Sequence, residues 1–183
     1  MSYASAAMTT IDQKQGECFV FTFKEGLLSS VAHDLRMKVQ RWSIAWDPEA
    51  RTIDARFDAS SLVVDTVMRD GHPAPGVLDA KDRDKIAKTT KDDVLDAGHH
   101  PEIRFRAQVP AGATAVRGDL TLHGKTSPAT VALRQEGTAW VAEATLHQPD
   151  WGVKPYSAMF GTLKVKADVK VRVSVPAELV GKV

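Results

Sequence analysis

The sequence predicts an all-β domain, because segments with alternating apolar and polar residues recur along most of the chain and short turn-forming segments separate them. The clearest segment is residues 163–175, where seven apolar residues alternate with six polar or charged ones. Residues 103–109 alternate in the same way, and Phe19, Phe21 and Phe23 alternate with smaller residues. Many short strands of this kind predict an antiparallel sandwich or barrel, and a closed barrel also removes exposed sheet edges.

Further strand candidates bring the count to about eight; they lie at residues 36–46, 53–59, 115–123, 130–135 and 139–147. Turn-forming residues separate these candidates at 47–48, 110–112, 124–128 and 137. Glycine, proline and asparagine-like residues favour turns because they adopt backbone angles that strands and helices do not use.

The alternation breaks over residues 69–96, which open with a glycine- and proline-rich loop at 71–76. From Asp79 onward the segment favours a helix, with Asp79 as its N-cap and few apolar residues available for packing. Lysines and aspartates are interleaved along it, which is typical of a solvated helix face rather than of a phosphate-binding patch. We therefore expect a lid or side helix against the strands.

Composition bounds the domain organisation and the partners. We expect a flexible N-terminus over residues 1–16 and a single domain over residues 17–183. The 24 basic and 23 acidic residues leave a net charge of +1, which argues against nucleic-acid binding. Cys18 is the only cysteine, so an internal disulfide is excluded.

Apolar stretches long enough to span a membrane are absent from the sequence. The first ten residues have neither a positively charged segment nor an apolar run typical of a secretory signal. The expected location is therefore the cytoplasm, or the periplasm if the natural N-terminus lies further upstream.

A catalytic hypothesis rests on Ser30, His33 and Asp34, which offer a hydroxyl, an imidazole and a carboxylate within one short segment. Adjacent residues of a strand point to opposite faces, so His33 and Asp34 would not converge there. The chain also lacks the Gly-x-Ser-x-Gly turn of many hydrolases. We therefore expect a turn in which His33 bonds to the backbone, no catalytic residues and no enzyme.

Six histidines raise the question of a metal site, since imidazole binds zinc, copper and nickel. Their spacing matches no metal-binding motif, and His-Glu-x-x-His is absent. His99, His100 and Pro101 are interpreted as a turn before the strand at Ile103, because proline favours extended geometry in the preceding residue. The sequence thus predicts no metal ligands and no cofactor.

Residues 118–128 read Gly-Asp-Leu-Thr-Leu-His-Gly-Lys-Thr-Ser-Pro, which fits the pattern G-x-L-T-x-H-G-x-T-x-P. This segment resembles a hairpin of the YceI-like family. Residues 82–86, 100–105 and 150–153 resemble the same family in the same order. Together the four matches cover roughly residues 17 to 175, and ordered matches are more specific than any one alone.

The resemblance implies an eight-stranded, antiparallel, lipocalin-like β-barrel with one side helix or lid. Its lumen would hold a polyisoprenoid or a similar amphiphilic chain, and its shared motifs include no catalytic set. Most members so described are periplasmic or secreted. In this reading the turns His123-Gly124 and Trp151-Gly152 close the barrel.

Our first hypothesis is therefore a protein that binds or carries a polyisoprenoid, quinone-like or fatty chain. Each buried CH₂ contributes about 0.8 kcal/mol, whereas association costs on the order of 4 to 15 kcal/mol, so a chain of some fifteen to twenty carbons binds on burial alone. The alternatives are a filled barrel that acts through its surface and the hydrolase; a homodimer stays open. The residues expected to line the lumen are Phe21, Phe57, Phe105, Leu120, Leu122, Trp140, Leu146, Leu163 and Val165.

Overall fold

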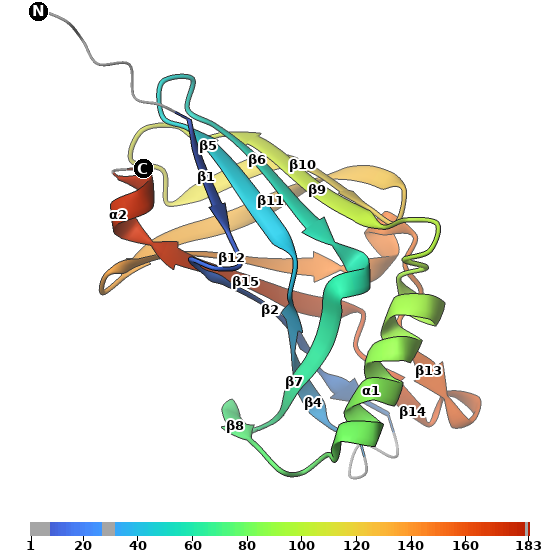
Figure 1. The fold of residues 1–183 in the computed structure, drawn as a ribbon. Coiled ribbons are helices and arrows are strands. Elements are labelled where there is room, and N and C mark those ends of the chain that lie inside the picture. The colour runs from blue at the N-terminus through green and yellow to red at the C-terminus, as the bar shows by residue number, and fades with distance from the viewer. Residues whose placement is uncertain (1–7, 27–31, 182) are drawn as a thin grey trace, which may run out of the picture.

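A strongly curled antiparallel sheet dominates the computed structural model, which describes residues 8–26, 32–181 and 183 (Figure 1). The sheet has twelve strands in the order β1-β5-β6-β9-β10-β11-β12-β15-β2-β4-β7-β8. Their bounds are β1 Thr9–Asp12, β2 Glu17–Thr22, β4 Asp34–Val39, β5 Trp42–Asp47, β6 Thr52–Asp58, β7 Leu62–Arg69, β8 His72–Ala74, β9 Glu102–Gln108, β10 Ala115–Leu122, β11 Lys125–Glu136, β12 Ala139–His147 and β15 Asp168–Pro176. The predicted all-β antiparallel class is confirmed.

The expected closed, eight-stranded barrel is corrected to a twelve-stranded curled sheet. Among the described residues, its terminal strands β1 and β8 do not pair with each other. A second, three-stranded sheet has the order β13-β14-β3, with bounds Ser157–Ala158, Leu163–Val165 and Lys24–Glu25. β13 and β3 have two residues each, too few for an alternating pattern to stand out in the sequence.

Two predicted strands are each divided in the structure. Residues 36–46 form β4 and β5, because the chain turns at Gln40 and Arg41, whose backbone N–H groups donate to the carbonyl and the hydroxyl of Ser61 at 3.2 and 3.0 Å. Residues 163–175 form β14 and β15, and between them the N–H of Lys166 donates to the carbonyl of Phe23 at 2.8 Å. Alternation continues through the second break, so the pattern alone does not reveal it, whereas at the first break the consecutive polar residues Gln40 and Arg41 shift the alternation by one position.

Two strands of four or more residues, β7 and β1, lie where the sequence pattern predicted none. β7 has a nearly continuous apolar run and a register shift opposite Arg36 and Met37, so it lacks a regular period of two. β1 lies within the segment that we expected to be flexible. Its Ile11 is 1% exposed and pairs with Ile44 of β5, which ties this strand to the sheet.

The predicted helix is confirmed as α1 (Ala80–Thr89), and the Asp79 carboxylate accepts from the N–H of Asp82 at 2.8 Å as its N-cap. A π-helical turn, η2 (Thr90–Val94), continues it. α1 lies beside β7 and buries Ala87 (Figure 1). None of the helices in the described residues is long and apolar enough to cross a membrane.

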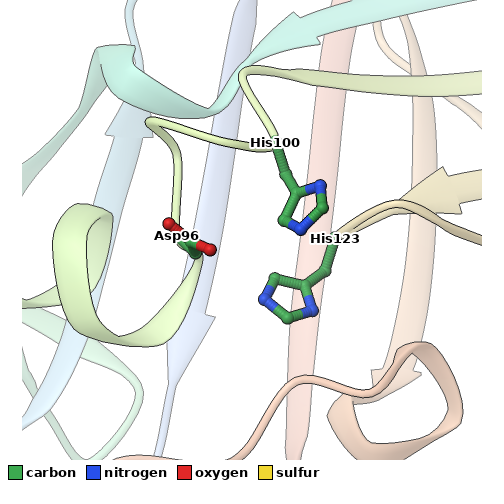
Figure 2. A group of neighbouring side chains, drawn as sticks. All are labelled: Asp96, His100 and His123. Carbon is green, nitrogen blue, oxygen red and sulfur yellow. The ribbon is translucent and has the colours of Figure 1, made fainter.

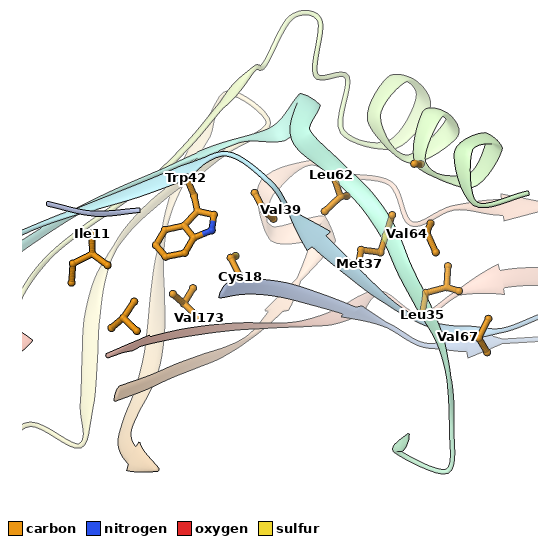
Figure 3. Packing of buried hydrophobic residues seen from close by; sticks show 12 residues of the cluster. Ile11, Cys18, Leu35, Met37, Val39, Trp42, Leu62, Val64, Val67 and Val173 are labelled. Carbon is orange, nitrogen blue, oxygen red and sulfur yellow. The ribbon is translucent and has the colours of Figure 1, made fainter. Parts of the chain in front are cut away.

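Buried residues form three clusters along the interior. The largest joins β1, β2, β4, β5, β7, β15 and α1, and includes Met37, Val39, Trp42 and Val173 (Figure 3). A second cluster around Trp46 lies at the end of the sheet near α2 (Ala177–Val180), which we call the α2 end. The third surrounds Trp151 at the opposite end, beside η2, which we call the α1 end.

Candidate ligand cavity

The curled sheet and η2 enclose a cavity of about 240 Å³. Its wall is almost entirely apolar and draws on most strands of the main sheet and on η2. The polar residues on the wall are Thr22, Asp58, Thr90 and Gln148. A space of this kind favours an apolar guest, because it offers burial and few hydrogen-bond partners.

Strict alternation on the later strands produces this wall. Val169, Val171 and Val173 of β15 line the cavity, while Lys170 and Arg172 lie on the outer face. These two cations form ion pairs with carboxylates of β12 and β11, with N···O distances of 3.5 Å for Lys170 to Glu143 and 2.5 Å for Arg172 to Glu136. The strand therefore has one dry and one charged face, as its sequence pattern predicts.

Of the nine residues expected to line the lumen, the structure brings five to the cavity wall: Phe57, Phe105, Leu120, Leu122 and Leu146. Gly118 has a role here that its motif alone does not reveal. A Cβ at Gly118 would lie 2.7 Å from Cζ of Phe105, so the glycine leaves room for the ring. Any larger residue at this position would displace Phe105.

Phe21, Trp140, Leu163 and Val165 do not line the cavity. On β2 the inner face carries Cys18, Val20 and Thr22, so Phe21 belongs to the outer face. Both faces of this strand are largely apolar, and the sequence therefore lacks the charged residues that identify an outer face. The neighbouring outer ring of Phe19 is covered by the guanidinium of Arg36, 4.7 Å from the ring centroid.

The other three residues, Trp140, Leu163 and Val165, lie beyond the cavity wall, at one end of the main sheet or in the small sheet. The indole N–H of Trp140 donates to the carbonyl of Gly181 at 3.0 Å, which fixes this side chain at the α2 end. Leu163 and Val165 belong to β14 of the small sheet. The break between β14 and β15 thus removes both residues from the lumen wall.

Three of the four polar residues on the wall, Gln148, Thr90 and Asp58, form side-chain hydrogen bonds within the protein. Gln148 donates to the carbonyl of Lys166 at 3.1 Å, and Thr90 donates to that of Ile86 at 2.9 Å. Partial burial opposes ionisation of Asp58, but hydrogen bonds from Ser60 and Arg41 outweigh it and keep the pKa of this carboxyl below its usual value. These hydrogen bonds occupy the polar groups of Gln148, Thr90 and Asp58, so we assign the three side chains structural roles.

Cys18 is 1% exposed and lies on the wall. Burial raises the pKa of its thiol to about 12, so the thiolate that acts as a nucleophile is scarcely populated at neutral pH. Asp34, of the catalytic hypothesis, accepts from the backbone N–H of Lys24 at 2.7 Å and so supports the fold. Ser30, the nucleophile of that hypothesis, lies outside the described residues.

A polar group at the α1 end was not apparent from the sequence. Asp96, His100 and His123 each offer one atom able to bind a metal, and these atoms all lie within 4.8 Å of one another (Figure 2). Their spacing in the sequence matches no metal-binding motif. The three residues come from a loop and a hairpin that are separate in the sequence and meet only in the fold. The sequence predicted no metal ligands, and this group is a candidate that the structure adds.

The fold and its interior define an antiparallel β domain built around an apolar cavity. A family model for the YceI-like domain matches residues 10–177. The chain therefore belongs to the YceI-like family, as the four motifs predict. A search of curated protein sequences found no match.

Solved structures share this fold at low sequence identity. BcnA of Burkholderia cenocepacia is 16% identical with a TM-score of 0.57, and the match covers 90% of this chain and 98% of BcnA. A polyisoprenoid binding domain from Saccharophagus degradans is 13% identical with a TM-score of 0.56, over 92% of this chain and 96% of that one. A Campylobacter jejuni YCEI protein is 12% identical with a TM-score of 0.51, over 79% and 84%.

Proposed function

We propose that this protein binds and carries an apolar or amphiphilic chain of the polyisoprenoid, quinone-like or fatty type in its interior cavity. The observation that carries the proposal is the nearly uninterrupted apolar wall. Membership of a family with a polyisoprenoid-binding relative supports the same ligand class. In this proposal the protein is a binding protein and not an enzyme.

The volume of the cavity limits how much of a chain can enter. Its volume of about 240 Å³ lies just below the range of about 300–1,000 Å³ that small-molecule pockets usually have. Burial contributes about 0.8 kcal/mol per CH₂, so affinity grows with the length of chain that enters. Phe57, Phe105, Leu120, Leu122 and Leu146 are the predicted ligand contacts that this proposal retains.

The alternative of a barrel filled by its own side chains is disfavoured by the same cavity. A purely surface-mediated role would require no interior space. Native mass spectrometry of freshly purified protein, followed by organic extraction, separates the two hypotheses. Carriage predicts a co-purified apolar chain or uptake of an added isoprenoid or fatty acid, whereas persistently empty protein that takes up neither contradicts it.

A substitution inside the cavity provides a sharper test. Ala144 lines the wall on β12, and its neighbour Thr145 is exposed on the outer face of the same strand. We expect Ala144→Phe to fill the space and to weaken binding of a fluorescent fatty acid by roughly tenfold or more, since each lost CH₂ contact costs about 0.8 kcal/mol. Binding is measured by fluorescence titration.

Thr145→Phe is the matched control, because it adds the same ring to the other face. We expect it to bind the probe as the wild type does, and far-UV circular dichroism checks that both variants fold. Equal probe affinity in the folded Ala144→Phe variant and the wild type would place the ligand outside this cavity.

A further inference from the structure

Three side chains that are able to bind a metal meet at the α1 end of the interior (Figure 2). Asp96 follows η2, His100 lies just before β9, and His123 lies in the hairpin between β10 and β11. The imidazole rings of the two histidines have centroids 4.7 Å apart. Among the residues that the structure describes, this is the only group of three or more histidine, cysteine or acidic side chains whose ligand atoms lie close enough together to hold an ion.

Backbone geometry holds Asp96 and His100 together. The carbonyl of Asp96 accepts from the N–H groups of His99 and His100 at 3.0 and 2.9 Å. Asp96 itself has a φ of +46°, in the left-handed region. The chain therefore turns sharply after η2, so that residues four apart in sequence reach the same place.

A second constraint places His123 against His100. Leu122 pairs with Lys125, so His123 and Gly124, whose φ angles are +52° and +72°, form the two-residue turn of the hairpin. A Cβ at Gly124 would lie 2.8 Å from Cε1 of His100. The His100 ring thus packs over the turn, in space that only glycine leaves free.

We propose that Asp96, His100 and His123 bind a divalent transition-metal ion, with Zn²⁺ as the best match. Two imidazole nitrogens and one carboxylate oxygen suit zinc and its first-row neighbours, whereas calcium and magnesium prefer oxygen ligands alone. Three protein ligands leave a further coordination position for water or another small ligand. This inference does not depend on chain binding in the cavity.

The distances are compatible with such a site after small movements. Zinc bonds of about 2.0–2.2 Å require ligand atoms somewhat more than 3 Å apart, and all three side chains are only partly buried, so rotation can close the remaining gap. His99 supports the arrangement from outside, because its Nδ1 lies 2.8 Å from Oδ1 of Asp96. Such outer partners orient metal-binding carboxylates.

An ion at this position would join separate parts of the fold. Asp96 and His123 each follow a residue of the cavity wall, Leu95 and Leu122. A bound ion would therefore tie η2 to the β10–β11 hairpin beside the cavity. Because binding to the folded state adds stability, Zn²⁺ is expected to raise the melting temperature.

The test is a Zn²⁺ titration of chelator-treated, dialysed full-length protein, followed by isothermal calorimetry and by thermal unfolding. The wild type should bind one Zn²⁺ per chain. His100→Ala and His123→Ala should each weaken binding by roughly 100-fold or more, since loss of even an outer partner costs about 10- to 100-fold. Zn²⁺ should raise the melting temperature of the wild type and leave that of these variants unchanged.

Two variants keep the test decisive. His123→Asn retains a residue that suits the turn geometry while removing the imidazole, so weak binding by this folded variant supports the site. His147→Ala is the matched control, because His147 forms an exposed pair with Asp168 at 2.7 Å. Among the described residues, this pair has no third histidine, cysteine or acidic side chain close enough to complete a metal site. Wild-type affinity in folded His123→Asn, or equal loss in His147→Ala, would overturn the proposal.

Discussion

The two ends of the curled sheet are closed by different means. At the α2 end, the indole N–H groups of Trp46 and Trp140 donate to the carbonyls of Val180 and Gly181 at 3.1 and 3.0 Å, and Trp46 and Val180 belong to an apolar cluster. At the α1 end, the indole of Trp151 donates to the carbonyl of Leu120 at 2.9 Å, next to the group of Asp96, His100 and His123. The α2 end is closed by apolar packing, whereas the α1 end also has polar groups suited to binding a metal ion.

The largest expected effect concerns the two buried tryptophans, Trp46 and Trp151, which are both 3% exposed. Replacing either with alanine should lower the free energy of unfolding by about 3–5 kcal/mol, because each change leaves a large cavity. Urea denaturation followed by circular dichroism measures this loss. A loss below about 1 kcal/mol, the size of one hydrogen bond, in only one variant would mean that the indole does not seal that end.

A smaller effect on stability should distinguish the β11–β12 hairpin at the α2 end from the β10–β11 hairpin at the α1 end. Gly137, at the α2 end, has a φ of +57°, and a Cβ added there would meet no atom within 4 Å, so Gly137→Ala should cost about 1–2 kcal/mol from backbone strain alone. Gly124→Ala should cost about 1–3 kcal/mol more, because the methyl group collides with His100. Chemical denaturation of both variants gives the difference.

The packing of His100 over the α1-end hairpin predicts this difference. Substituting His100→Ala in the Gly124→Ala background should recover the additional loss and leave the strain. Equal stability losses for Gly124→Ala and Gly137→Ala would show that the ring does not crowd the hairpin.

The smallest effect should be a pH dependence at the α2 end. Hydrogen bonds from Arg134 and Arg172 lower the pKa of Glu136 below its usual value of 4.5. A carboxyl with a lowered pKa in the folded state contributes stability above its unfolded pKa, and this contribution is lost as the pH falls through the folded pKa. Glu136→Gln should therefore melt at a lower temperature than the wild type at pH 7, and the difference should shrink below pH 4.5.

At the α1 end, the β10–β11 hairpin has a neutral pair of side chains, which provides the control for the charged Glu136. The hydroxyls of Thr121 and Thr126 lie 2.7 Å apart across the hairpin. Thr121→Ala should change the melting temperature by the same amount at pH 7 and at pH 4. If its effect varied with pH as that of Glu136→Gln does, the charge-based difference between the two ends would be refuted.

Sequence patterns predicted the fold best where one face of a strand is charged. The bounds of β12 match the predicted residues 139–147, and the inner face of β15 was assigned correctly. β2 failed because phenylalanines occupy one face and small apolar residues the other, which leaves no charge to mark solvent. β7 was missed because its apolar residues run together.

The candidate sites differ in the same respect. Phe105 and Leu120 could be placed on the cavity wall because alternation fixes the direction of a side chain along a strand. His100 and His123 lie in two of the family-like motifs, yet their meeting depends on how a loop packs over a hairpin. Local periodicity carries no information about such a long-range contact.

The buried Cys18 gives the protein an internal reporter of its own motion. Its thiol faces the cavity, and it is the only cysteine in the sequence. A thiol reagent can reach it only when the wall opens, so the labelling rate reports the population of open molecules when reclosing is fast. Labelling kinetics would therefore measure how often the interior becomes accessible to a guest, without any substitution in the chain.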